Sequence, residues 1–169
     1  KNTKKSKQLK NELLGLLFIA LAIFGSGASA ISDGAIPGGL EYLFRFFLGI
    51  WYFVASVFLL VTGIILLVKR RYPDFSNKKL VGFYILFSGI LLITHIQTYE
   101  RLLIQDVSVI GSTWNHFISF ISGQGTSVQT GGGMLGGILL TFTNYLFSIA
   151  GAKIVAVFSM IIGIIYITE

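Results

Sequence analysis

Apolar residues occur along this chain in long blocks that are separated by short polar intervals. Three blocks cover about residues 13–31, 46–68 and 80–96, and a longer apolar stretch runs from 134 to 168. The first block is long enough to cross roughly 30 Å of hydrocarbon as a helix. Blocks of this kind, without amphipathic alternation, predict an all-α integral membrane protein.

The last apolar stretch is about twice as long as one crossing, and Gly151, Ala152 and Lys153 divide it. We expect residues 154–168 to form the fourth crossing and residues 134–150 to form a re-entrant, tilted or interfacial helix on the outer side. Non-helical backbone at such a break must be shielded by protein, because lipid cannot satisfy its hydrogen bonds. The preceding segment, 98–133, is polar with apolar patches and predicts short external helices on the membrane surface.

Composition supports this prediction and excludes several kinds of chemistry. Of the 169 residues, 54% are hydrophobic and only 12% are charged, whereas soluble domains are about a quarter charged. The chain has no cysteine, so disulfides, thiolate metal sites and cysteine nucleophiles are excluded.

The basic residues predict how the helices are oriented. Ten of the 13 Lys and Arg residues lie in two intervals, the tail at 1–11 and the connector at 69–79. Cytoplasmic loops retain the excess of positive charge, so both intervals are expected in the cytoplasm and 98–133 outside. We expect four crossings in the transmembrane domain, which covers residues 12–169. Because an even number of crossings returns the chain to the side on which it started, we expect the C-terminus in the cytoplasm as well.

The lysine-rich tail has further interpretations. Retention in the cytoplasm and attraction to anionic lipid explain it most simply. Direct DNA binding is an alternative. So is a secretory signal ending at Ala28-Ser29-Ala30, although the apolar run is longer than such signals have.

Motifs for catalysis are missing from these residues. The sequence contains no phosphate-binding GK[ST] loop, no HExxH and no GxSxG. We therefore expect no catalytic residue, cofactor site or metal site in this chain. No acidic residue lies deep in a predicted crossing, which argues against a proton- or cation-coupled transporter.

A few polar residues remain candidates for function within or beside the membrane. Asn144 is expected to hydrogen-bond between helices, or alternatively to line a conduit. His95 is expected to be an interfacial hydrogen-bonding residue, or alternatively part of a proton relay. Arg45, Trp114 and Lys153 are expected at the membrane interface.

Small residues recur at a spacing that permits close helix packing. Gly132 and Gly136 stand four residues apart, as do Gly133 and Gly137, and so do Gly25 and Ser29 in the first block. Such pairs let helix backbones approach each other. Their contacts are expected either within the chain or between subunits of an oligomer.

Four groups of residues resemble a known family. They are Tyr42-Leu43-Phe44-Arg45-Phe46-Phe47, Trp51, Thr94-His95-Ile96-Gln97 and Gly131-Gly132-Gly133-Met134-Leu135-Gly136. In this order, after a basic tail, they resemble the N-terminal membrane domain of FtsK/SpoIIIE DNA translocases, especially the SpoIIIE-like versions of Gram-positive bacteria. The resemblance covers essentially the whole chain, and the triple glycine is its most specific part.

The resemblance implies a membrane-anchoring and oligomerising domain of a motor at the division septum. It implies a homo-oligomer, hexameric as in the family, that moves double-stranded chromosomal DNA between compartments during division or sporulation, with septal proteins as partners. ATP and Mg²⁺ would belong to a motor domain expected after Glu169. Two other functions compete with this one: a small transporter or channel, and a division-machinery adaptor that docks through residues 114–121.

Overall fold

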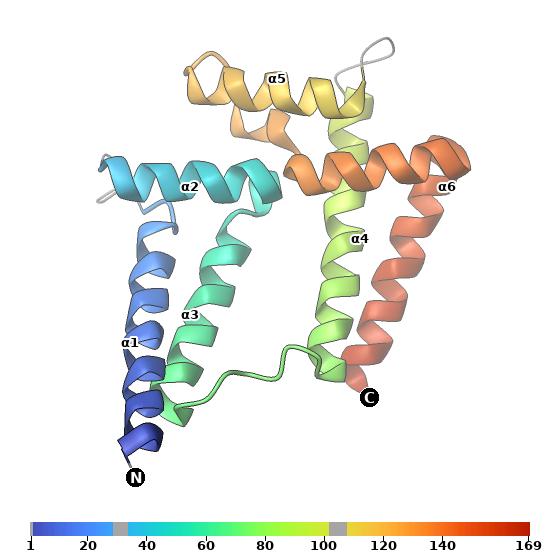
Figure 1. Ribbon diagram of the computed structural model, residues 1–169. Coiled ribbons are helices and arrows are strands. Elements are labelled where there is room, and N and C mark those ends of the chain that lie inside the picture. The colour runs from blue at the N-terminus through green and yellow to red at the C-terminus, as the bar shows by residue number, and fades with distance from the viewer. Residues whose placement is uncertain (1, 29–33, 102–107) are drawn as a thin grey trace. The chain divides into compact units, whose positions relative to one another are not determined.

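The structure, a computed structural model, describes residues 2–28, 34–101 and 108–169, and every regular element in these residues is helical (Figure 1). The all-α prediction is confirmed. In chain order the elements are α1 (Asn2–Phe24), α2 (Ala35–Leu48), the 3₁₀ turn η1 (Gly49–Trp51), α3 (Phe53–Lys69), α4 (Lys78–Arg101), α5 (Val109–Ile121), the 3₁₀ turn η2 (Ser127–Thr130) and α6 (Gly133–Thr168).

The chain forms two compact units, each with its own internal packing. Unit 1 consists of Lys1–Phe44 and Tyr52–Asp74, and unit 2 consists of Arg45–Trp51 and Phe75–Glu169. Unit 1 therefore holds the α1–α3 hairpin, and unit 2 holds α4, α5 and α6. The last turn of α2 and all of η1 belong to unit 2 although they precede α3 in the chain.

Unit 1 is a helical hairpin whose two helices cross at a pair of glycines. A Cβ atom at Gly63 would lie 2.8 Å from the carbonyl oxygen of Gly15, and one at Gly15 would lie 2.7 Å from that of Gly63. Neither position leaves room for a larger residue without moving backbone. Leu66, one turn further along α3, is fully buried beside this crossing.

The hairpin is also fastened where α1 begins and α3 ends. Arg70 follows the last residue of α3 with a left-handed backbone, φ 55°. Its carbonyl oxygen accepts a hydrogen bond from Asn11 Nδ2 at 2.7 Å, and its Nε lies 2.6 Å from Glu12 Oε1. The basic N-terminal turns of α1 and the basic end of α3 therefore lie at the same end of unit 1.

Unit 2 contains a second hairpin, formed by α4 and the second half of α6. A Cβ at Gly82 would lie 2.9 Å from the carbonyl oxygen of Gly163, and one at Gly163 would lie 2.7 Å from that of Gly82. Two turns further along α4, Gly89 packs in the same way against Ala156. The buried apolar cluster that adjoins these contacts consists of Leu92, Ile96, Val109, Leu140, Ala152 and Ala156.

The helix α6 is bent at Ser148, whose backbone angles are φ 59° and ψ 176°. Figure 1 shows α6 running across α4 before the bend and then turning to lie beside it. The predicted division at Gly151-Ala152-Lys153 is therefore wrong by a few residues, since those residues are helical. Gly151 and Lys153 indicated the region of the break. The exact position depends on the backbone angles of Ser148, which a hydropathy pattern cannot predict.

The apolar block at 46–68 is another correction, because it does not form one helix. Residues 46–48 end α2, Gly49 has φ +59°, and α3 begins only at Phe53 after a bend of 112°. Residues 35–39, which lie between the first two apolar blocks, form the start of α2, where Pro37 is tolerated because it lies in the first turn.

Two of the described helices, α4 and α6, are long and apolar enough to cross a membrane. The bent pair formed by α2–η1 and α3 would add a third if it counts as one crossing. These helices fit a membrane protein. Four crossings remain a prediction, since α1 carries Lys7, Lys10 and Glu12 in its first half and α3 has only 17 residues.

Candidate functional site

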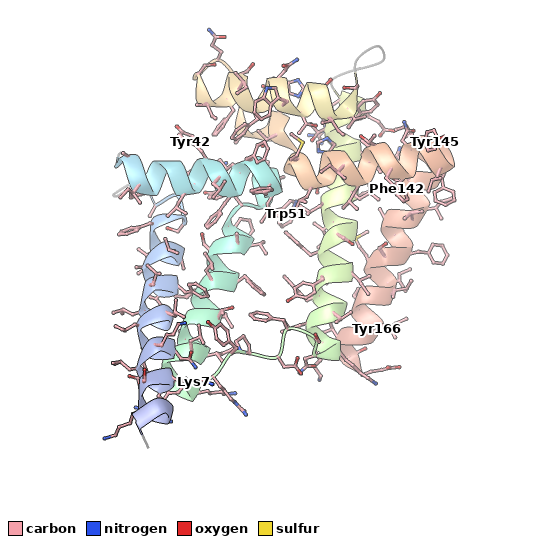
Figure 2. The ribbon with its side chains drawn as sticks, viewed as in Figure 1. Lys7, Tyr42, Trp51, Phe142, Tyr145 and Tyr166 are labelled. Carbon is pink, nitrogen blue, oxygen red and sulfur yellow. The ribbon has the colours of Figure 1, made fainter. Side chains whose placement is uncertain are left out.

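Three of the four residue groups that carried the family resemblance, and the last three residues of the other group, Arg45-Phe46-Phe47, lie in unit 2. The backbone N–H of Ile50 donates to the carbonyl oxygen of Gly131 at 2.9 Å. The indole Nε1 of Trp51, labelled in Figure 2, donates to Thr94 Oγ1 at 3.1 Å. The turn η1 is thereby fixed both to the triple glycine and to the C-terminal half of α4.

Glycines at this meeting point allow three chain segments to touch backbone to backbone. Gly49, Gly131 and Gly133 all have positive φ, of 59°, 51° and 65°. A Cβ at Gly49 would collide with the carbonyl oxygen of Gly131, and one at Gly133 would collide with the backbone nitrogen of Gly49. Side chains other than hydrogen are excluded here by both conformation and space.

The next glycines pack on α4 and α5. A Cβ at Gly132 would collide with the carbonyl oxygen of Leu91, one at Gly136 would lie 3.0 Å from His95 Cβ, and one at Gly137 would lie 3.0 Å from Thr113 Oγ1. We call Gly49, Gly131, Gly132, Gly133, Gly136 and Gly137, with Leu91, His95 and Thr113, the glycine junction. The structure thus uses all four predicted glycines of this segment for contacts within the chain.

His95 is buried inside the glycine junction. It is only 4% exposed, and its Nε2 lies 3.0 Å from Thr113 Oγ1. The Thr113 hydroxyl donates its single proton to the Val109 carbonyl at 2.7 Å, so Nε2 of His95 must carry the proton that joins the two side chains. Nδ1 is then an acceptor, buried without a partner among the described residues and next to Gly131.

A second histidine lies close to this arrangement. A cavity of about 10 Å³ is lined by His95, Thr98, Tyr99, Val109, Ser112, Thr113, His116 and Gln129. It has room for about one water molecule. Burial lowers the pKa of His116, so its imidazole is neutral near neutral pH. Sequence reasoning missed Thr113 and His116, because their role depends on the packing of α5 against α4.

Aromatic side chains join α5 to the last turn of α2. Phe46 makes edge-to-face contacts with Trp114 and Phe117, with ring centroids 5.9 Å and 5.1 Å apart. The guanidinium of Arg45 lies 5.2 Å from the centroid of the Phe120 ring. Arg45 and Trp114 thus belong to one aromatic cluster, in which Trp114 keeps 48% of its surface exposed. Their predicted position at the membrane interface is not tested by these contacts.

The remaining predicted residues lie apart from the glycine junction. Lys153 Nζ pairs with Glu100 Oε1 at 2.7 Å, which links α6 just beyond its bend to the end of α4; sequence reasoning missed Glu100. Asn144 is half-buried in the first half of α6. In unit 1, Gly25 packs against the ring of Phe44, while Ser29 lies outside the described residues.

The chemistry of the glycine junction is therefore packing and neutral hydrogen bonding. In the described part of the chain, no group of three or more His, Cys, Asp or Glu side chains could hold a metal ion. The arrangement packs η1, α4 and α6 together through backbone contacts and joins α5 to them through the Thr113 side chain.

Comparison with known proteins identifies the family. Over 100% of its length, the chain is 61% identical to the DNA translocase FtsK of Oceanobacillus iheyensis, of which it covers 22%. It is 35% identical over 98% of its length to the DNA translocase SpoIIIE of Bacillus subtilis, of which it covers 21%. The chain matches the N-terminal fifth of FtsK/SpoIIIE DNA translocases.

Other relatives agree with this match. The DNA translocase FtsK of Bacillus cereus is 32% identical over 94% of the chain, which covers 20% of that protein. The chain thus spans about a fifth of the length of the FtsK and SpoIIIE relatives that it matches. No family model matches the chain, and no solved structure matches it.

Proposed function

We propose that this chain is the membrane-anchoring and oligomerising part of a septal DNA translocase, with four membrane crossings and both ends in the cytoplasm. One observation carries the proposal: the whole chain matches the N-terminal fifth of FtsK/SpoIIIE proteins and contains helices apolar enough to cross a bilayer. The four crossings would be α1, α3, α4 and the second half of α6.

The internal geometry of unit 1 supports this topology. The contacts of Arg70 with Asn11 and Glu12 bring the end of α3 to the start of α1. The lysine-rich tail and the basic group Lys69-Arg70-Arg71 therefore share one end of the hairpin. If both helices cross, the two basic intervals lie on the same side of the membrane, as the positive-inside rule requires.

The geometry of unit 2 extends the argument to the C-terminus. A Cβ at Gly82 would lie 2.7 Å from Tyr166 Cβ, so the start of α4 and the end of α6 share one end of this second hairpin. The connector 70–77 between the hairpins is polar, follows Lys69 and precedes Lys78 and Lys79, so we do not expect it to cross the hydrocarbon. In the proposed topology Glu169 therefore lies on the same side as the basic tail.

This topology suits the task that the relatives' names describe. A motor that follows Glu169 would meet DNA, ATP and Mg²⁺ in the cytoplasm. We propose that the full-length protein acts on double-stranded chromosomal DNA during division or sporulation, as a homo-oligomer, hexameric in the manner of the family it resembles. Because the glycines of the glycine junction are used within one chain, contacts between copies would come from other surfaces.

An adaptor role through protein contacts is a second candidate, and one observation favours it. The helix α5 exposes three apolar side chains at helical spacing, Ile110, Trp114 and Ile118, each with 41% to 48% of its surface accessible. They stand on the opposite side from Thr113 and Val109, which pack inward. This stripe is the surface that would dock on a septal protein.

Localisation of a fluorescent fusion tests the proposal. A fluorescent protein attached after Glu169 should label the membrane of dividing Gram-positive cells and concentrate at the septum. The matched control is the same fluorescent protein on an unrelated single membrane helix, which should label the membrane evenly. Diffuse cytoplasmic fluorescence would contradict membrane anchoring, and even labelling like that of the control would contradict septal targeting.

A further inference from the structure

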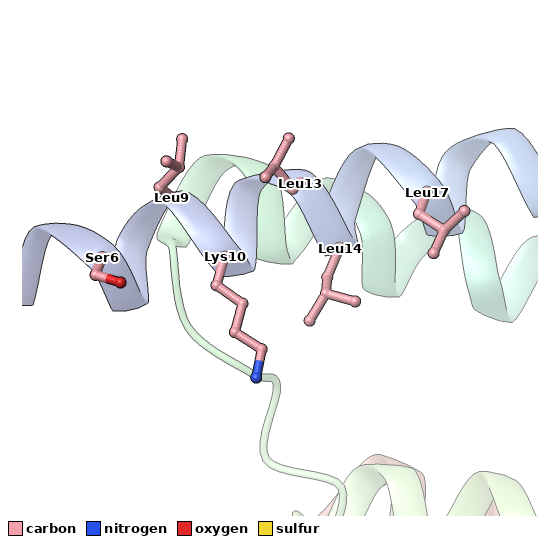
Figure 3. Close-up of a pocket in the computed structure, with 6 residues that line it drawn as sticks. All are labelled: Ser6, Leu9, Lys10, Leu13, Leu14 and Leu17. Atoms are coloured by element: carbon pink, nitrogen blue, oxygen red, sulfur yellow. The ribbon is translucent and has the colours of Figure 1, made fainter.

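One face of α1 forms a groove that the rest of unit 1 does not cover (Figure 3). The groove has a volume of about 430 Å³ and is lined by Ser6, Leu9, Lys10, Leu13, Leu14 and Leu17. Figure 3 shows Lys10, Leu14 and Leu17 extending to the same side of the helix. All six residues come from α1, so the groove is a property of this helix.

The groove faces away from α3. Asn11, Glu12 and Gly15 make the contacts with α3. At 100° per residue, Lys10 and Leu17 lie on the opposite side of α1, about 140° and 160° from Gly15. Leu13 and Leu17 accordingly keep 60% and 50% of their surface exposed.

Polarity changes along the groove in the direction of the helix axis. Its first two turns present the Ser6 hydroxyl and the Lys10 ammonium, and the next two present only leucine side chains. The distance from Lys10 to Leu17 along the axis is about 10 Å. A phospholipid has the same order of groups, with a polar headgroup followed by an acyl chain.

The charges around the groove favour an anionic headgroup. Lys5, Lys7 and Lys10 are exposed, and none of them forms an ion pair with a described residue. Glu12 is the one carboxylate of α1, and it is paired with Arg70 on the α3 side, so it does not neutralise them. A zwitterionic headgroup would bring its own ammonium group close to these lysines.

We propose that the α1 groove binds one anionic phospholipid. The phosphate contacts Lys10 and Ser6, and an acyl chain lies along Leu13, Leu14 and Leu17. The proposal rests on the proposed crossing of the membrane by α1, which places Lys10 at headgroup level. The proposed site is more specific than a general attraction of the basic tail to a charged membrane surface. It assigns the headgroup contact to one lysine, Lys10, and the acyl-chain contact to one face of α1.

Native mass spectrometry of the detergent-solubilised chain tests the site, with phosphatidylglycerol or phosphatidylcholine added at equal concentration. The chain should retain one phosphatidylglycerol under conditions that remove phosphatidylcholine. Lys10→Gln should weaken this retention about five-fold, the loss expected for one basic residue near a headgroup. The matched control is Lys5→Gln, which removes the same charge about 140° around the helix and should leave retention unchanged.

Three results would overturn the proposal. Equal losses in Lys5→Gln and Lys10→Gln, or equal retention of the two lipids, would mean that charge or apolar contact acts without a defined site. A dimer that dissociates in Leu13→Ala and retains no lipid would mean that a second copy occupies the groove. The mass measurement needs neither a septum nor a motor, so its result is independent of the localisation experiment.

Discussion

Ser148 has the most unusual backbone among the described non-glycine residues. Its φ of 59° and ψ of 176° fall in a region that is essentially restricted to glycine and that costs other residues about 1–3 kcal/mol. Replacing serine by glycine also has a cost. Glycine has more conformational freedom in the unfolded chain, which lowers the free energy of unfolding by about 0.5–1 kcal/mol. We therefore expect Ser148→Gly to raise the free energy of unfolding by about 1 kcal/mol, measured by thermal unfolding in detergent.

A second serine in α6 provides the control for this prediction. Ser159 lies in the regular part of the helix, where glycine has a lower helix propensity than serine by about 0.5 kcal/mol. Ser159→Gly should therefore lower stability slightly. If Ser148→Gly lowers stability to the same extent, α6 does not bend at Ser148.

Single residues also show where sequence reasoning reaches its limit. The sequence indicated His95 as a hydrogen-bonding residue and Gly132, Gly133, Gly136 and Gly137 as packing residues. The structure brings these residues together in the glycine junction. The predicted position of His95 at the membrane interface stays a prediction, and the sequence did not indicate the partner of its Nε2, which is Thr113, 18 residues further along on another helix. Hydropathy reports how apolar a segment is, and it cannot report which distant side chain becomes a hydrogen-bond partner.

At the scale of elements, each unit has a hairpin that is held by a glycine pair. In unit 2 a Cβ at Gly163 would lie 2.6 Å from Leu86 Cβ and 2.7 Å from the Gly82 carbonyl oxygen. An added methyl group must push backbone apart, and overpacking of this kind costs about 1–3 kcal/mol. We expect Gly163→Ala to lower the free energy of unfolding by this amount, measured by circular dichroism during thermal denaturation.

Gly39 in α2 is the matched control, because a Cβ added there would meet no atom within 4 Å. Gly39→Ala should be neutral or stabilising by up to about 1 kcal/mol, since alanine favours helix more than glycine does. A Gly163→Ala protein as stable as Gly39→Ala would show that α4 and α6 do not cross at this glycine.

The sequence predicts that the elements are helices, but it does not predict the directions in which the helices run. The apolar blocks correctly indicated an all-α chain, and α4 lies where the third block does. The block at 46–68 was misread as one helix because its residues are apolar on both sides of the turn at Gly49. The direction of the chain there depends on contacts of Gly49 with Gly131 and Gly133, which are more than 80 residues away.

At the scale of the whole molecule, the two units share one internal plan. Each hairpin has a glycine crossing, and each has a group of basic residues at the end where its first helix begins, although Arg101 and Lys153 lie at the other end of the second hairpin. Neither observation depends on how the units are placed relative to one another. Both observations support the proposed topology.

Single cysteines can test this topology, because the chain contains no natural cysteine. Ser76 is exposed in the connector between α3 and α4, and Ser122 is exposed just after α5. A membrane-impermeant maleimide should label Ser122→Cys but not Ser76→Cys in intact cells, and it should label both after the membrane is permeabilised. Labelling of Ser76→Cys in intact cells would place the basic connector outside. A motor following Glu169 would then lie on the side of the membrane that has no chromosome to move.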